Sequence, residues 1–126
     1  MRPKSALVFD DNLICRTFFS DILDEQNFAV TSFADPTLFL TDHDYEYCPA
    51  DHPCVDLIIT DNQMPGMTGL EFLEQLKQKG CKVPDQRKAI ISGNWSSEQV
   101  TRAEKIGCKV FHKPTPMDEL HAWLEE

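Results

Sequence analysis

The chain has 126 residues, of which 41% are hydrophobic, and a formal net charge of −9. This size and composition predict one globular domain, residues 1–126, and the negative charge argues against non-specific binding to nucleic acids or anionic membranes. No apolar run is long enough to span a membrane, and the N-terminus reaches acidic residues before a signal-peptide core could form, so we expect a cytoplasmic protein.

Short apolar runs alternate along the chain with segments of helical periodicity. The predicted strands are residues 6–9, 28–33, 55–60, 88–92 and 109–113. The predicted helices are residues 12–26, a short helix that begins at 35–36 and contains Leu38, Phe39 and Leu40, and residues 68–79, 96–107 and 115–124. This alternation predicts an α/β, doubly wound fold, with a five-stranded parallel sheet covered on both faces by five helices.

The first predicted helix carries a broad apolar face. Its members recur at helical spacing, and they are Leu13, Ile14, Phe18, Ile22 and Leu23. Such a face is typical of a helix that packs on a core. By contrast, residues 43–53 are polar, acidic and rich in turn formers, so we predict a loop there.

Cysteine usage gives no sign of a disulfide framework. The five cysteines are Cys15, Cys48, Cys54, Cys81 and Cys108. Their number is odd and they contain no CxxC pair, which favours free buried thiols over a metal or redox site. Only Cys48 and Cys54 are close enough in sequence to consider as a disulfide, and a cytosolic setting disfavours it.

Polar side chains stand at the carboxyl ends of four predicted strands. Asp10 and Asp11 follow the first strand, Asp61 the third and Ser92 the fourth, while Lys113 ends the fifth. The carboxyl ends of parallel strands share one edge of the sheet, where open α/β sheets bind ligands. Each acid alone could cap a helix or a turn, but five such coincidences indicate a functional site.

Three neighbouring carboxylates repel one another unless a cation joins them, and Mg²⁺ prefers carboxylate oxygens and water. The Lys113 ammonium and the Ser92 hydroxyl suit the oxygens of a phosphoryl group. Asp61 lies among these groups and is a plausible nucleophile, since aspartyl phosphates are covalent intermediates of known reactions.

In order and spacing, four motifs resemble the receiver domain of two-component response regulators over essentially the full length of the chain. They are LVFDDN, LIITDNQMPGMTG, AIISG and FHKP. The resemblance implies a flavodoxin-like fold with strand order 2-1-3-4-5. It also implies that a histidine kinase or phosphotransfer protein phosphorylates Asp61, and that the domain is no enzyme beyond its own phosphorylation and dephosphorylation.

The resemblance further assigns roles at the site. Asp11, Asp61 and the backbone carbonyl of Gln63 would hold Mg²⁺ (or Mn²⁺), and Asp10 would act mostly through water. Lys113 would contact the phosphate and Asp61. In the same way, the hydroxyl of Ser92 would bond a phosphate oxygen and move on activation.

The chain departs from the family pattern near the predicted switch. Val110 stands three residues before Lys113, where the family usually has an aromatic residue, and the aromatic Phe111 comes one residue later. The segment 107–113 also looks one residue short, and 43–53 looks longer than usual. These departures place in question the family's coupling between the hydroxyl residue and an aromatic rotamer.

In the family, the output partner usually binds the face formed by the fourth helix, the fifth strand and the fifth helix. Candidate surface residues on this face are Trp95, Val100, Val110, His112 and Trp123. Among them, His112 is better explained as an ordinary strand histidine, and Trp123 as core packing. Whether the receiver stands alone or belongs to a larger regulator or hybrid kinase is left open.

Other classes fit the residues less well. A haloacid-dehalogenase-like phosphatase needs Asp-x-Asp, but Asn12 and Gln63 stand two residues after Asp10 and Asp61. A flavodoxin needs a phosphate loop rich in Ser, Thr and Gly after the first strand, and none is present. The remaining alternative is a degenerate receiver that acts as a phosphorylation-independent interaction module.

Overall fold

Five parallel strands form one sheet in the order β2-β1-β3-β4-β5. The strands are β1 (Lys4–Phe9), β2 (Phe28–Phe33), β3 (Leu57–Asp61), β4 (Lys88–Ser92) and β5 (Lys109–His112). The α-helices are α1 (Leu13–Glu25), α3 (Gly69–Gln78), α4 (Ser97–Ile106) and α5 (Met117–Leu124), and a 3₁₀ turn spans Asp85–Arg87. The predicted doubly wound fold and its strand order are confirmed.

The computed structural model describes residues 4–37, 39 and 55–125. Four of the five predicted α-helices lie wholly within these ranges. Pro36, Thr37 and Phe39 are helical, at the start of the predicted second helix. The rest of that helix, the predicted loop 43–53 and the cysteines Cys48 and Cys54 lie outside the described residues. No helix in the described ranges has the length and apolar content needed to cross a membrane.

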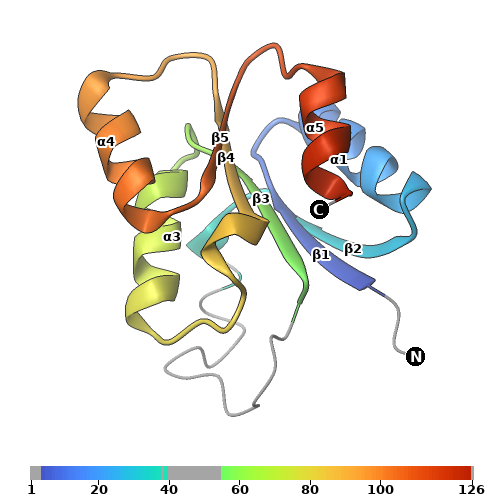
Figure 1. Cartoon of the computed structure of the whole chain (residues 1–126), viewed down its shortest axis with the longest axis horizontal. Helices are drawn as coiled ribbons and strands as arrows, with labels where there is room; N and C mark the ends of the chain where they lie inside the picture. Colours follow the sequence, from blue (N-terminus) through green and yellow to red (C-terminus); the bar gives the residue numbers. More distant parts are fainter. Residues whose placement is uncertain (1–3, 38, 40–54, 126) are drawn as a thin grey trace.

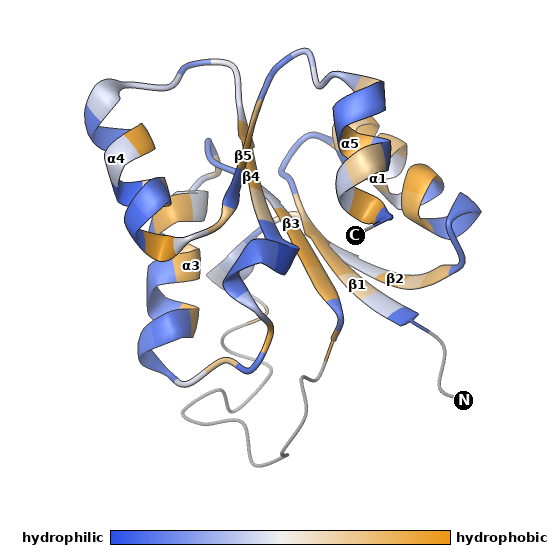
Figure 2. Ribbon diagram, in the orientation of Figure 1, coloured by the Kyte–Doolittle hydropathy of each residue, from blue (hydrophilic) through white to orange (hydrophobic). Residues whose placement is uncertain are grey.

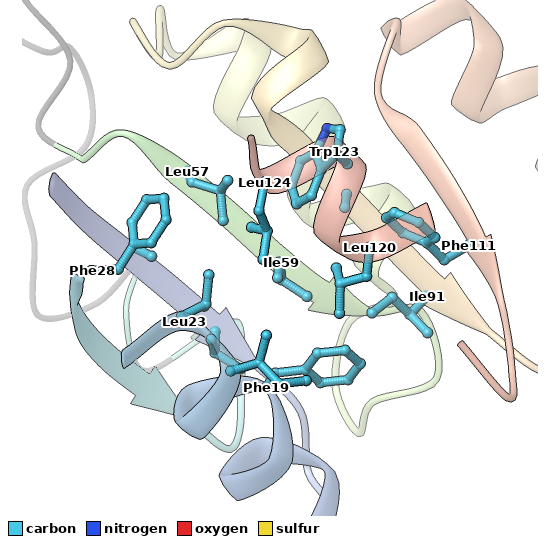
Figure 3. Packing of buried hydrophobic residues seen from close by; sticks show 14 residues of the cluster. Phe19, Leu23, Phe28, Leu57, Ile59, Ile91, Phe111, Leu120, Trp123 and Leu124 are labelled. Carbon is cyan, nitrogen blue, oxygen red and sulfur yellow. The ribbon is translucent and has the colours of Figure 1, made fainter. Parts of the chain in front are cut away.

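The helices cover both faces of the sheet, with α1 and α5 on one face and α3 and α4 on the other (Figure 1). Every residue of β3 and β4 is buried, as expected for central strands of a parallel sheet. Figure 2 shows hydrophobic residues concentrated along the central strands, whereas the helices carry both hydrophobic and hydrophilic sides. Alternate strand residues therefore enter two cores, and Figure 3 shows the one beneath α1 and α5.

The prediction for α1 is only partly right. Ile22 and Leu23 are buried, together with Phe19, but Leu13, Ile14 and Phe18 are 64%, 80% and 44% exposed. The apolar residues of α1 cover a wider arc than the sheet can bury, because neighbouring positions on a helix are rotated by about 100°. The first turn of α1 therefore presents apolar side chains to solvent.

Side-chain caps fix the helix ends that lead into and out of the sheet. The Asn12 side chain accepts a hydrogen bond from the Cys15 N–H at the start of α1. Ser96 and Gln99 form a capping box at the start of α4, which ends at Gly107 in the left-handed conformation. These caps set the direction of the loops that carry the polar residues described next.

Candidate functional site

The predicted site residues converge at the carboxyl edge of the sheet. Asp10 follows β1, Asp61 ends β3, and Ser92 ends β4, and all three are at most 5% exposed. Lys113 lies directly after β5, at the start of a cis peptide bond to Pro114. Asp11 is exposed on the loop that leads into α1. The structure thus brings together the carboxylates, hydroxyl and ammonium that the sequence placed at strand ends.

The acidic residues form a close cluster. One carboxylate oxygen from each of Asp10, Asp11 and Asp61 can be chosen so that all three lie within 4.8 Å of one another. Burial raises the pKa of the Asp10 carboxyl above its ordinary value; the hydrogen bond from the Asn12 N–H (2.9 Å) opposes this, and the charge of Asp61 adds to it. The cluster therefore concentrates negative charge that the protein only partly compensates.

Lys113 supplies the nearest positive charge to Asp61. Its Nζ lies 3.3 Å from Asp61 Oδ1. Partial burial lowers the pKa of Lys113, but the Asp61 carboxylate outweighs that effect and the net pKa is raised, so the ammonium keeps its proton. Despite this ion pair, Asp61 Oδ1 is buried with no hydrogen-bond donor in the described part of the chain.

These donors fit a hard divalent cation. All the available ligand atoms are oxygens. Buried Asp61 Oδ1 has no hydrogen bond from the described residues, and a bound cation would give this atom the partner that it lacks. Gln63 lies on the exposed loop after Asp61, and its carbonyl as a ligand remains a prediction. The cluster can thus hold a metal ion of the type that binds phosphoryl oxygens.

Ser92 and Lys113 are linked across neighbouring strands. The Lys113 N–H donates to the Ser92 carbonyl at 3.0 Å, which extends the pairing of β4 and β5 to the edge of the site. The Ser92 hydroxyl accepts a hydrogen bond from the Asn94 N–H at 3.2 Å. This hydroxyl is therefore bound to its own loop when no phosphoryl group is present.

Three further residues support the site but were missed in the sequence. Gly69 opens α3, where a Cβ would lie 2.5 Å from the Asp61 carbonyl oxygen, and its N–H donates to the carbonyl of buried Asn62. Arg16 Nη1 donates to the Asp10 carbonyl at 2.8 Å. The glycine after a strand and turn could have signalled close backbone approach, whereas no sequence pattern points to Arg16.

An apolar groove of about 460 Å³ borders the site. It lies between the first turns of α1 and the loop before α5, and its lining includes Ile14, Phe18, Pro114 and Met117. Lys113 also lines this groove, so the groove and the Asp61 site share one side chain. The exposed start of α1 is therefore next to the acidic cluster.

The structure also shows which core the aromatic residue of β5, Phe111, enters. Phe111 is 1% exposed and packs against Trp123 of α5, with ring centroids 5.8 Å apart. Figure 3 shows both rings in the core beneath α5. Val110 faces the opposite core, with α3 and α4. Phe111 therefore does not replace the missing switch aromatic, and Trp123 is a core residue as predicted.

Comparisons with known proteins agree with this architecture. The sequence profile of the response regulator receiver domain matches residues 6–125. The transcriptional regulatory protein FixJ of Bradyrhizobium diazoefficiens is 31% identical over 120 residues, which cover 94% of this chain and 53% of that protein. The two-component response regulator ORR6 of Oryza sativa is 30% identical over 106 residues, covering 84% and 59%. The chain thus spans about half the length of these curated relatives.

Solved structures show the same fold. Full-length FixJ from B. japonicum matches 94% of this chain and 54% of its own, with a TM-score of 0.74 and 27% identity. The chemotaxis protein CheY4 of Vibrio cholerae matches 98% of both chains, with a TM-score of 0.76 and 23% identity, a likeness that bears on the fold alone.

Proposed function

Since the chain belongs to the response regulator receiver domain family, we propose that residues 1–126 form a single phosphorylation-controlled signalling domain. Asp61 accepts a phosphoryl group from the phosphohistidine of a histidine kinase or phosphotransfer protein in the cytoplasm. The modification then changes the binding of an output partner at the surface formed by α4, β5 and α5. The domain catalyses only its own phosphorylation and dephosphorylation.

The observation that carries this proposal is the state of the Asp61 carboxylate. Asp61 is 5% exposed, and its Oδ1 has no hydrogen-bond donor among the described residues, although the Lys113 ammonium lies 3.3 Å away. Leaving a buried carboxylate oxygen without a hydrogen bond is unfavourable for folding, and such atoms concentrate at functional sites. A nucleophile held in this way has its charge paired with Lys113, and its Oδ1 receives no hydrogen bond from the described residues.

Phosphoryl transfer needs little more than position and charge balance. A carboxylate oxygen of Asp61 attacks phosphorus, and the bond between phosphorus and the donor histidine nitrogen breaks as the new P–O bond forms. Lys113 keeps its proton because the pKa is raised, so it can pair with the added negative charge. Ser92, at the adjacent strand end, is placed to donate its hydroxyl to a phosphoryl oxygen.

The metal requirement follows from the charge of the cluster. Asp10, Asp11, Asp61 and the Gln63 carbonyl would hold Mg²⁺ or Mn²⁺, which when bound neutralises phosphoryl charge. Without a cation, the carboxylates would repel an incoming phosphoryl group. We therefore expect phosphorylation to depend on the divalent ion.

An apolar surface beside Asp61 is available for docking of the phosphodonor protein. Leu13, Ile14 and Phe18 are exposed at the start of α1, and Met117, 39% exposed, lies across the groove. Isolated surface hydrophobics are common, but a cluster of them at the mouth of a site favours protein contact. We assign this cluster to the docking of the donor protein.

Intact-mass measurement after incubation with phosphoramidate tests the proposal. The wild-type protein should gain one phosphoryl group only when Mg²⁺ is present, and Asp61→Asn should gain none. Asp21→Asn, an exposed acid on α1, is the matched control and should behave as the wild type. Stoichiometric labelling of Asp61→Asn would refute the site. No labelling together with no Mg²⁺ binding would favour the phosphorylation-independent interaction module.

A further inference from the structure

The aromatic contact on the α4 side of β5 comes from the loop between β4 and α4. Trp95 Nε1 donates a hydrogen bond to the Phe111 carbonyl at 3.1 Å. Its indole also meets the His112 ring edge-on, with centroids 6.4 Å apart. Trp95 is half-buried and packs on the same core as Val110. The indole thus fastens the loop to β5 at the point where the usual switch aromatic is missing.

Trp95 lies between the site and the start of α4. Ser92 is three residues before it, and the intervening Asn94 N–H donates to the Ser92 hydroxyl at 3.2 Å. Ser96, the next residue, caps α4 through its hydrogen bond with the Gln99 N–H. A displacement of the Ser92 hydroxyl therefore acts on Asn94, which directly precedes Trp95 and the cap residue Ser96.

No β5 side chain can take over this role. Alternate strand residues face opposite sides of a sheet, so Phe111 is committed to the core with Trp123 (Figure 3). Val110 lies on the face of the sheet that α3 and α4 cover, but it has no ring that can exchange between buried and exposed positions. His112 is exposed and is itself one of the groups that the indole contacts.

We propose that Trp95 transmits phosphorylation of Asp61 to the surface formed by α4 and β5, an inference that rests on the proposed function. When the Ser92 hydroxyl turns to a phosphoryl oxygen, it leaves the Asn94 N–H. A hydrogen bond to a charged phosphoryl oxygen is stronger than one between neutral groups. The loop then moves, and the Trp95 indole leaves the Phe111 carbonyl and His112. The output surface therefore changes shape at Trp95 and at the first turn of α4.

Fluorine NMR on protein labelled with 5-fluorotryptophan tests this proposal. The chain has two tryptophans, so the spectrum has two resonances, and Trp95→Phe assigns them. Phosphoramidate with Mg²⁺ should shift the Trp95 resonance and leave that of Trp123 in place. In Ser92→Ala, compared at equal phosphoryl occupancy by mass, the Trp95 shift should be lost although the phosphoryl charge is present.

Amide hydrogen exchange gives a second readout. In the wild type, phosphorylation should change the amide exchange rates at the start of α4. Trp95→Phe keeps an aromatic ring but lacks the indole N–H. This variant should gain the same phosphoryl mass without the change in exchange. An unshifted Trp95 resonance in fully phosphorylated protein would overturn the role of Trp95 and leave Asp61 as the acceptor. Absence of any mass gain would overturn both proposals.

Discussion

Replacing Asp10 with asparagine should stabilise the metal-free protein and weaken its binding of Mg²⁺. Asparagine has the shape of aspartate and keeps an oxygen for the hydrogen bond from the Asn12 N–H, which is 2.9 Å long. The substitution removes the buried negative charge of Asp10. The pKa of the Asp10 carboxyl is raised mainly by burial and also by the charge of Asp61. The ionised form of Asp10 therefore opposes folding at neutral pH.

The size of the effect follows from the distances in the cluster. Two unit charges 4.8 Å apart repel by about 3 kcal/mol at an effective dielectric constant of about 20. Lys113, with Nζ 3.3 Å from Asp61, offsets part of this repulsion, so we expect a gain of about 1 to 2 kcal/mol. For 126 residues, each kcal/mol raises the Tm by about 4 °C, which gives an increase of about 4 to 8 °C.

Thermal unfolding with and without Mg²⁺ separates this explanation from a general effect of charge. Asp21→Asn changes the net charge equally but lies exposed on α1, and its Tm should match the wild type. Added Mg²⁺ should raise the wild-type Tm more than that of Asp10→Asn, because a ligand that binds the folded state stabilises it more when its affinity is higher. A lower Tm for metal-free Asp10→Asn, or equal Mg²⁺ binding, would refute the reasoning.

The same variant predicts a pH dependence. The folded-state pKa of Asp10 lies above the unfolded value of 3.8, so its penalty is full above the folded pKa and disappears as both states become protonated. The stability gap between Asp10→Asn and the wild type should therefore narrow as the pH falls from 7 towards 4. A constant gap would mean that ionisation of Asp10 is not its cause.

Three other substitutions or treatments probe the scaffold. Gly69→Ala should cost about 2 kcal/mol in unfolding free energy, because its Cβ would lie 2.5 Å from a backbone oxygen. Gly93→Ala should cost far less in the same denaturant titration, because its Cβ would lie 3.6 Å from the Cβ of Lys113, an ordinary van der Waals contact. Asp85→Asn should cost about 1 to 3 kcal/mol in unfolding free energy, because the Lys88 side chain is 1% exposed and its ammonium would lose the carboxylate 3.3 Å away. Lys88→Met removes the buried charge itself and should change stability by under about 1 kcal/mol. Equal losses in the two variants would refute this account. Burial raises the pKa of the Cys108 thiol to about 11, so Cys108 should resist alkylation by iodoacetamide at pH 8 in the folded protein and react in urea. Rapid labelling of Cys108 itself in the folded protein, located by peptide mass, would contradict this.

The residues at the carboxyl edge of the sheet could be predicted because a short sequence pattern determines where each strand ends. A buried parallel strand needs a short apolar run, and the residue after the run must lie at the edge. Asp10, Asp61, Ser92 and Lys113 could therefore be placed together from chain position alone, and the structure brings them together. Free buried thiols were also expected, and the thiols of Cys15 and Cys108 are free, although both residues are half-buried rather than fully buried.

Contacts that depend on how elements pack were not predictable. Helical spacing identified the apolar residues of α1, but it could not say that the sheet covers only part of that arc and leaves Ile14 exposed. The approach of Gly69 to the Asp61 backbone depends on the path of a loop, and the hydrogen bond from Arg16 to Asp10 depends on a side-chain rotamer. Periodicity carries information about one element at a time, whereas these contacts join two.

The alternation of β5 gives the clearest physical constraint on how this domain can signal. A shift of one residue along a strand moves a side chain to the other face of the sheet. The aromatic at position 111 is therefore buried against α5 and cannot respond to the hydroxyl of Ser92, which lies on the neighbouring strand beside the α4 loop. The loop between β4 and α4 joins the Ser92 end of the site to α4, and Trp95 on this loop is hydrogen-bonded to the Phe111 carbonyl. An aromatic residue on the loop can thus take the position that an aromatic on the strand usually fills.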